Sequence, residues 1–383
     1  MVVPLLDLNT QNQAHSDALK LAFERVVGSS QFILGHEVAS FEKSVAQRLG
    51  SEHAIGVSSG TDALLLALMA LEIGPGDEVL CPSYTFFATA GCIARLGAIP
   101  VFIDVHTDSF NLDVADAVSK ITPKTKAILP VHLYGQSADM GAITELAQEH
   151  RLKVVEDCAQ SMGARWKDDE AGTFGDFGIY SFFPTKNLGG FGDGGMLVTN
   201  DADLAEKARV LRVHGSKPKY YHKLLGGNFR LDALQASLLA VKLGSLNRFL
   251  EQRRANAAYY IESFKSKLGQ HLTLILPSEM EHCWHTWNQF TIRVVDGKRD
   301  ALRDHLKQNE IASEIYYPLS LHQQECFQDL PTMPCPVSEQ LAQECLSLPI
   351  YPELSREMQD EVVVAVTDFL CLAGWFPRAC NHS

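Results

Sequence analysis

The stretch Val154-Val155-Glu156-Asp157-Cys158-Ala159-Gln160 joins an apolar run to two acidic residues and a polar tail. Residues 153–156 are typical of a buried strand, and a helix-like segment at 141–151 precedes them. In sheets of parallel strands, ligands bind beyond the carboxyl ends of the strands. Asp157 is therefore expected at a ligand site, although an aspartate that caps a helix is an alternative interpretation.

Similar strand–helix units fill the first two thirds of the chain. Apolar segments at 78–81, 100–104, 127–132 and 196–199 are expected strands, and helix-like segments such as 63–71 and 203–211 separate them. This alternation predicts an α/β fold with a mostly parallel central sheet that helices cover on both faces.

A long helical stretch from 233 to 267, interrupted near Gly244, is expected to lead out of this fold. Beyond it, 285–295 and 314–317 are expected strands, and 299–309 and 356–370 are expected helices. We therefore expect a large α/β domain over residues 1–250 and a small C-terminal α+β domain over residues 251–383.

Composition excludes several classes of function. The chain has 383 residues and a formal net charge of -13, which disfavours nucleic acid as a partner. Its nine cysteines include no CxxC pair, so neither a disulfide framework nor a zinc site is expected. No apolar run reaches the ~18 residues of a membrane span. A cytoplasmic, reducing compartment is the expectation.

Two motifs are expected to be misleading. Gly190-Phe-Gly192-Asp-Gly-Gly195 has the GxGxxG spacing of dinucleotide sites, but a strand-like segment follows it where such sites have a helix. His282-Cys-Trp-His285 resembles a metal motif, but alternate residues of a strand point to opposite faces. We predict neither a nicotinamide site nor a metal site.

Two further segments are candidates for holding a flat phosphate ester. Ser58-Ser-Gly60-Thr61-Asp62 leads into a helix, whose first amides can bind phosphate, although plain helix capping is the alternative. Pro82-Ser-Tyr-Thr-Phe86-Phe-Ala-Thr89 follows a strand, where an aromatic ring could stack on a heterocycle or simply pack in the core.

Lys186 is the candidate nucleophile. It lies in Ser181-Phe-Phe-Pro-Thr-Lys186-Asn187, after a short apolar strand and before glycines. A desolvated lysine has a lowered pKa and attacks aldehydes, whereas a lysine in a surface loop does not. The order of phosphate turn, aromatic residue, strand-end Asp157 and Lys186 resembles that of pyridoxal-5'-phosphate (PLP) enzymes of the aspartate-aminotransferase fold type.

These motifs make the chain similar to the DegT/DnrJ/EryC1/StrS family of PLP-dependent nucleotide-sugar aminotransferases. The resemblance covers nearly the whole chain, with matching segments at 59–64, 82–89, 130–136, 156–160, 181–195, 228–235, 316–318 and 346–349. It implies PLP-dependent transferase fold type I and a homodimer with shared active sites.

The family resemblance also implies roles for individual residues. Lys186 would form the Schiff base, Asp157 would pair with the pyridinium nitrogen, and Gln160 would lie near the ring hydroxyl. Phe86 would stack on the ring. The phosphate would be held by Gly60, Thr61 and Ser181, together with Asn228 from the other subunit. His322 would lie on the substrate side.

The second substrate is expected to meet a basic segment. Residues 207–231 contain seven Lys and Arg and no Asp or Glu. With Lys219, Tyr221, His222 and Arg230 as candidate contacts, this segment could hold a nucleotide diphosphate, or it could be a solvated loop. Resemblance to the C3-aminating relatives implies transfer from L-glutamate to a 3-keto rather than a 4-keto nucleotide sugar, for surface polysaccharide or a secondary metabolite.

Other interpretations remain at this stage. A PLP lyase or dehydratase acting on a nucleotide sugar would use the same cofactor. A non-catalytic sensor that binds PLP or sugar would not need Lys186, Asp157 and Ser181 together. The nucleotide, the sugar epimer and the pathway are not determined by the sequence.

Overall fold

The fold is built around one seven-stranded sheet in a computed structural model that describes residues 1–268, 274–331 and 333–372. The strand order is β1-β9-β8-β5-β4-β2-β3, in which β9 runs antiparallel to both neighbours and the other pairs are parallel. The strands are β1 (His53–Val57), β2 (Glu78–Pro82), β3 (Ile99–Ile103), β4 (Thr125–Ile128), β5 (Lys153–Asp157), β8 (Phe177–Ser181) and β9 (Gly195–Thr199). The predicted mostly parallel α/β sheet is confirmed.

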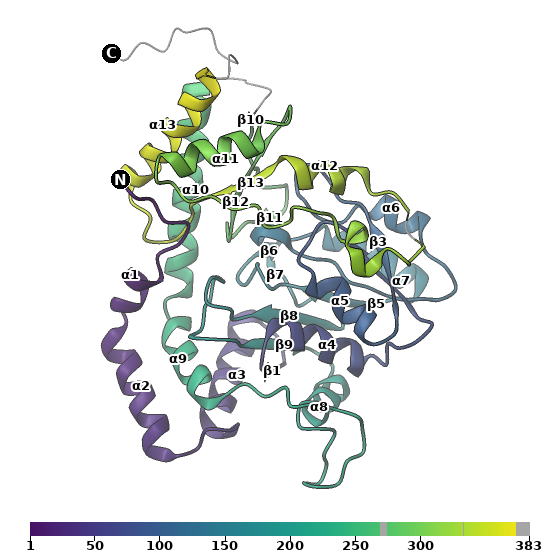
Figure 1. Cartoon of the computed structure of the whole chain (residues 1–383). Helices are drawn as coiled ribbons and strands as arrows, with labels where there is room; N and C mark the ends of the chain where they lie inside the picture. Colours follow the sequence, from purple (N-terminus) through teal and green to yellow (C-terminus); the bar gives the residue numbers. More distant parts are fainter. Residues whose placement is uncertain (269–273, 332, 373–383) are drawn as a thin grey trace.

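Helices cover both faces of this sheet and extend along one side of it (Figure 1). α4 packs against β8 and β9, while α3 packs against β1 and α9. The helices are α1 (Leu8–Gln13), α2 (Ser16–Ser29), α3 (Gly35–Leu49), α4 (Gly60–Ala70), α5 (Ala88–Arg95), α6 (Val114–Ser119), α7 (Met140–His150), α8 (Ala202–Leu211) and α9 (Ala233–Leu243). The loop that joins α8 to α9 projects away from the body.

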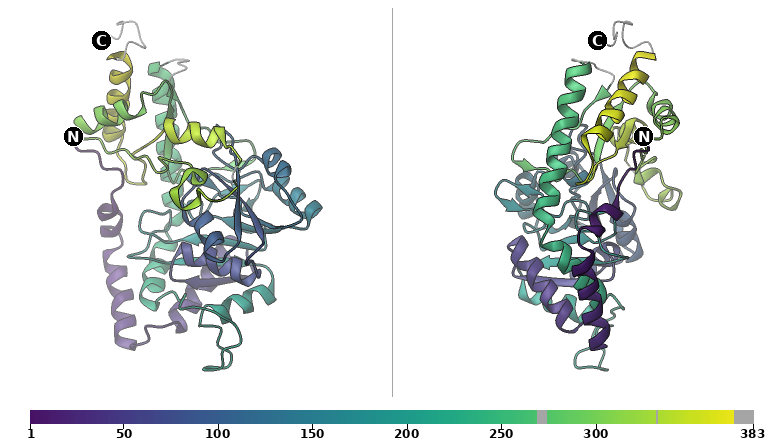
Figure 2. Two further views of the ribbon diagram at one scale, coloured as in Figure 1. Left: turned by 45° about the vertical axis from the view of Figure 1, so that its right-hand side comes forward. Right: turned by 90° about the vertical axis from the view of Figure 1, so that its left-hand side faces the viewer.

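A second apolar core forms around a small antiparallel sheet of β10 (Leu274–Ile275), β12 (Phe290–Val294) and β13 (Cys345–Leu348). The long α10 (Leu246–Leu268) runs from the first core to the second, beside α13 (Arg356–Leu372), as both views in Figure 2 show. α11 (Arg299–Gln308) and α12 (Pro336–Glu344) complete this part. The domain boundary predicted near residue 250 falls inside α10 and stays a prediction.

Two expected strands are shorter in the structure than the sequence indicated. Of residues 285–295, only Phe290–Val294 form a strand, because Trp287 has a positive φ of 53° that interrupts extended backbone. Residues 314–317 contribute a single bridge from Glu314 to Ser347. A third sheet, which has three short strands, is formed by β6 (Arg165–Trp166), β7 (Asp169–Glu170) and β11 (Cys283–Trp284).

The described helices include none that is both long enough and apolar enough to cross a bilayer.

Candidate active site

A cavity of about 430 Å³ opens at the carboxyl edge of the central sheet. The ends of β5 and β8 lie side by side there, with Asp157 paired in register with Ile179. Segments that follow β1 and β2 reach the same edge, because these strands run in the same direction as β5 and β8. The cavity brings together seven of the predicted residues: Gly60, Thr61, Phe86, Asp157, Gln160, Ser181 and Lys186.

One end of the cavity is an anion seat. Ser59 caps α4 through its hydroxyl, which accepts from the amide of Asp62, and the amides of Gly60 and Thr61 have no acceptor in the described chain. A Cβ added to Gly60 would lie only 2.7 Å from the Cβ of Ser181. Glycine therefore lets a helix start and a serine hydroxyl converge, which is the arrangement that binds phosphate at a helix N-terminus.

Asp157 forms the opposite, buried wall. Its carboxylate accepts from the hydroxyl of Thr89 at 3.0 Å and from the amide of Ala159 at 3.1 Å. Burial raises the pKa of Asp157, and these two donors and the charge of Lys186 oppose that rise. The carboxylate is thus held in one orientation, and any further positive charge placed in the cavity would stabilise its ionised form.

Lys186 lies on the loop that follows β8. Burial lowers the pKa of its amine from 10.5 to about 8, and the Asp157 carboxylate acts in the opposite direction. The next residue fixes this loop, because Asn187 donates to the carbonyl of Met162 and to the hydroxyl of Thr286, and accepts from Asn288. The result is an amine that is substantially neutral near pH 8, held beside a carboxylate.

Gln160 and Phe86 complete the walls. The amide oxygen of Gln160 accepts from the backbone of Tyr134, and its nitrogen donates to the hydroxyl of Tyr317 at 2.7 Å. Phe86 leaves 60% of its surface exposed at the cavity, so one face of an apolar ring is available for stacking.

Comparison with known proteins identifies the kind of enzyme that has this cavity. Residues 14–367 match the DegT/DnrJ/EryC1/StrS aminotransferase family. The chain is 48% identical to a pleiotropic regulatory protein of Geobacillus stearothermophilus, over 96% of this chain and 99% of that one. It is 44% identical to a UDP-N-acetyl-3-dehydro-alpha-D-glucosamine 3-aminotransferase of Acidithiobacillus ferrooxidans, over 95% and 97% of the two chains. The solved structure of S. venezuelae DesV in complex with a ketimine intermediate superposes with a TM-score of 0.91 at 41% identity, covering 96% and 98%.

This chain belongs to the DegT/DnrJ/EryC1/StrS aminotransferase family. It is a PLP-dependent aminotransferase with the aspartate-aminotransferase-like fold type I. The cavity fits this cofactor on its own geometry. It offers a phosphate seat around Gly60, a stacking face on Phe86, a carboxylate for a cationic ring nitrogen, and an amine for the aldehyde.

The remaining predicted residues do not line the cavity within one chain. Asn228, Lys219, Tyr221 and His222 are exposed on the loop between α8 and α9, and Arg230 lies in its return strand, paired with Val57. His322 is buried behind the cavity, where its two ring nitrogens contact Ser83 and Glu339 at 2.6 and 3.1 Å. This arrangement does not place His322 at the cavity, and the substrate-side role predicted for it stays a prediction.

The positive field of the basic segment is weaker than its composition indicates. Three of its cations are paired with carboxylates: Lys207 with Glu72, Lys217 with Glu206, and Arg212 with Glu42. Lys219 and Lys223 have no carboxylate partner in the described residues, and Lys219 lies over the ring of Tyr220. These two are the cations of the loop that a substrate could reach.

Sequence reasoning missed several residues of this aminotransferase site. Thr89 lies on the first turn of α5, three positions after Phe86, and helical spacing could have indicated that both face the cavity. Tyr316, Tyr317 and Gln289 come after α10 in the sequence and line the cavity only because the chain returns to it.

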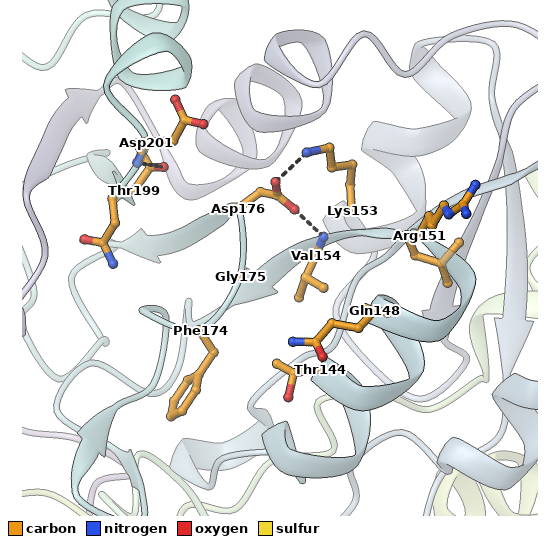
Figure 3. Close-up of a pocket in the computed structure, with 13 residues that line it drawn as sticks. Thr144, Gln148, Arg151, Lys153, Val154, Phe174, Gly175, Asp176, Thr199 and Asp201 are labelled. Carbon is orange, nitrogen blue, oxygen red and sulfur yellow. Dashed lines mark hydrogen bonds and ion pairs between the residues drawn. The ribbon is translucent and has the colours of Figure 1, made fainter.

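A larger hollow of about 690 Å³ lies at the opposite edge of the sheet (Figure 3). Asp176 there pairs with Lys153 at 2.8 Å and accepts from the amide of Val154, so its charge is already satisfied. The hollow lies at the amino end of β5, away from Asp157 and Lys186. We assign it no catalytic role.

In the described residues, His132, Glu156 and Cys158 gather as metal-type ligands beneath Asp157. The carboxylate of Glu156 accepts from the amides of Gly172, Phe174 and Gly175, and from the Nε2 of His132. His132 Nδ1 accepts from the amide of Ala138. These bonds give the cluster a structural role in holding the turn at 172–175 against β5.

The lowered pKa of Lys186 predicts a pH dependence for cofactor attachment. The rate at which added PLP bonds to cofactor-free protein should rise with pH and level off above a midpoint near 8, because only the neutral amine attacks the aldehyde. Absorbance in stopped flow measures this. Since the Asp157 carboxylate raises the pKa of Lys186, Asp157→Asn should move the midpoint to lower pH. A midpoint near 10.5 would contradict the burial of the amine.

The close approach at Gly60 predicts a specific loss of cofactor affinity. Gly60→Ala should weaken PLP binding about tenfold or more, because its Cβ must push Ser181 out of the phosphate seat. Fluorescence titration of the cofactor-free protein measures the Kd. Gly28→Ala is the matched control, since a Cβ there meets nothing within 4 Å. Equal Kd values for the two variants would show that PLP binding does not need the close approach of Gly60 to Ser181.

Proposed function

We propose that this aminotransferase moves an amino group from L-glutamate to C3 of a keto nucleotide sugar. The observation that carries the proposal is the convergence of Lys186, Asp157 and the phosphate seat in one cavity of a family member. The Acidithiobacillus ferrooxidans relative is named for amination at C3 of a UDP-linked sugar, which supports the position and the substrate class. A role in making surface polysaccharide or a secondary metabolite is consistent with such a product.

The residues divide the chemistry among them. PLP, when bound, supplies an electron sink for the carbon that loses a proton. Asp157 keeps the ring nitrogen protonated, and Thr89 keeps Asp157 in place. Lys186, as a neutral amine, would take the proton from the α-carbon of the amino donor and deliver it to the C4' carbon of the cofactor. In the second half-reaction it would move a proton in the reverse direction, from C4' to the acceptor carbon of the sugar. Gln160 contacts the ring hydroxyl, and Ser181, Gly60 and Thr61 hold the phosphate.

The active unit in this proposal is a homodimer that shares its sites. The loop that joins α8 to α9 projects away from the body (Figure 1). Asn228, Lys219 and Tyr221 belong to this loop and do not line the cavity of their own chain, so they would act on a neighbouring one. Large apolar side chains at the cavity rim are also exposed, among them Phe86 and Phe183. A twofold-related copy would cover them and bring in the loop.

The proposal extends to the compartment and the domains. Seven cysteines of the described residues are free thiols, which favours a reducing compartment such as the cytoplasm; they are Cys81, Cys92, Cys158, Cys283, Cys326, Cys335 and Cys345. The apolar cluster around β12 and β13 is separate from the clusters of the central sheet, which supports a division into a large domain and a small one, with α10 as the link. The Geobacillus relative is named as a regulator, but Lys186, Asp157 and Ser181 retained in one cavity favour catalysis over a binding-only sensor.

The proposed reaction predicts two separable half-reactions. The purified PLP form should convert to the pyridoxamine form with L-glutamate, without release of ammonia, and should then be restored by a 3-keto nucleotide sugar. Absorbance spectra follow both steps, and mass spectrometry identifies the amino sugar. Lys186→Ala should lose turnover while still binding PLP. Ammonia release would indicate a lyase, and restoration by 4-keto sugars alone would contradict the C3 assignment.

The shared site predicts complementation between two defective subunits. Replacing both Lys219 and Lys223 by alanine should raise the KM for the nucleotide sugar about tenfold and leave the glutamate half-reaction unchanged. A mixed dimer of this variant with Lys186→Ala contains one intact site if the loop serves the partner. Its KM should then be that of the wild type. A mixed dimer that keeps the high KM would show that the loop serves its own subunit.

A further inference from the structure

Arg253 is a buried cation whose binding capacity is only partly used. It lies on α10 with 3% of its surface exposed. In the described residues, the guanidinium of Arg253 forms hydrogen bonds only through Nη1, which donates to the carbonyls of Trp287, Asn288 and Ile350 at 3.2, 3.3 and 3.0 Å. Nε has no partner in the described chain, and no bond is formed by Nη2. A buried polar group without a partner is costly and calls for an explanation.

No carboxylate of the described residues lies within ion-pair distance of Arg253. Burial lowers the pKa of Arg253 to about 10, and Glu353 is the acidic group that opposes this. Glu353 itself leaves one buried carboxylate oxygen without a partner, and burial raises its pKa. Arg253 therefore keeps its charge at neutral pH without a counterion, although an acidic residue is nearby.

A small chamber of about 50 Å³ adjoins this guanidinium. Its walls include Arg253, Thr185, Gln289 and Tyr316, and the last three also line the cofactor cavity. The volume suits a group of two or three heavy atoms rather than a sugar ring or a nucleotide.

We propose that this chamber seats a carboxylate of the amino-acid donor, with Arg253 as its counterion and Tyr316 as a hydrogen-bond donor. The inference rests on the proposed function, since it needs an amino acid as one of the two substrates. A guanidinium and a carboxylate form charge-assisted bonds that are strongest where water is excluded. The amino donor must place a carboxylate beside the reacting carbon, whereas the keto sugar reacts through a carbonyl group, so a seat for the donor's carboxylate is expected to affect the glutamate half-reaction alone.

The alternative is that Arg253 only clamps the three carbonyls that connect α10 to the second core. That role predicts that replacing the guanidinium of Arg253 would harm both half-reactions and the stability of the protein together. The donor-binding role predicts harm to the glutamate half-reaction alone. The two roles are therefore separated by measuring each half-reaction.

The test uses Arg253→Lys and Tyr316→Phe in the PLP-loaded enzyme. Arg253→Lys should raise the KM for glutamate about tenfold or more, with the sugar half-reaction within about twofold of wild type. Tyr316→Phe should raise the KM for glutamate about three- to tenfold and should affect the glutamate half-reaction more than the sugar half-reaction. Arg254→Lys is the matched control, since Arg254 bonds to Glu279 and to the carbonyl of His285 outside the chamber. Tyr316→Phe keeps the test decisive if Arg253→Lys does not fold.

Binding of glutarate, a dicarboxylate without an amine, supplies a measurement independent of turnover. Calorimetry should show about tenfold weaker binding to Arg253→Lys than to wild type or Arg254→Lys. Alanine and 4-aminobutyrate as donors assign the carboxylate: loss with alanine identifies the α-carboxylate, and loss with 4-aminobutyrate identifies the side-chain carboxylate. Equal losses in both half-reactions, or unchanged glutarate binding, would overturn the inference. A wild-type enzyme that ignores glutamate and glutarate would instead refute the proposed function.

Discussion

The site depends on placing an amine and a carboxylate in the same desolvated cavity. Burial favours the neutral form of each, which lowers the pKa of Lys186 to about 8 and raises that of Asp157. These two shifts have opposite value for catalysis, because a neutral amine is the useful form of Lys186 and an ionised carboxylate is the useful form of Asp157. Thr89 and the amide of Ala159 stabilise the ionised carboxylate, and a cationic ring would do so further. The surrounding fold therefore has to exclude water from both groups while supplying hydrogen-bond donors to Asp157 alone.

Most of the sheet and the centre of the site could be predicted because their signals are local. Asp157 ends an apolar strand and Gly60 opens a helix, and both properties are visible within a few residues. The expected strand at 285–295 is confirmed only over Phe290–Val294, because distant groups determine the backbone of the residues before it. Arg253 and Asn187 bond to residues 286–288, and they hold that segment in a turn that no apolar pattern indicates.

The outer part of the site could not be read from the sequence for a related reason. Gln160 owes its orientation to Tyr317, which is 157 positions away, and the chamber at Arg253 is assembled from segments as distant in the sequence as Leu5, Thr185 and Ile350. The substrate-side role that the family resemblance implied for His322 stays a prediction, while the contacts of its ring with Ser83 and Glu339 could not be foreseen from local sequence. Composition likewise overstated the basic segment, because carboxylates that neutralise it lie elsewhere in the chain.

A transaminase has to admit two unlike substrates to one amine in turn, so their recognition cannot rest on the amine itself. A nucleotide sugar carries its charge on phosphates, far from the carbon that reacts, whereas an amino acid carries a carboxylate one bond from that carbon. Exposed lysines on a projecting loop suit the first, because mobile side chains in water can meet a large ligand. A fixed guanidinium beside the cavity suits the second, because a small anion must be oriented as well as attracted. In the proposed reaction, the separation of these two kinds of cation would let one cavity serve both half-reactions without either substrate blocking the residues that recognise the other.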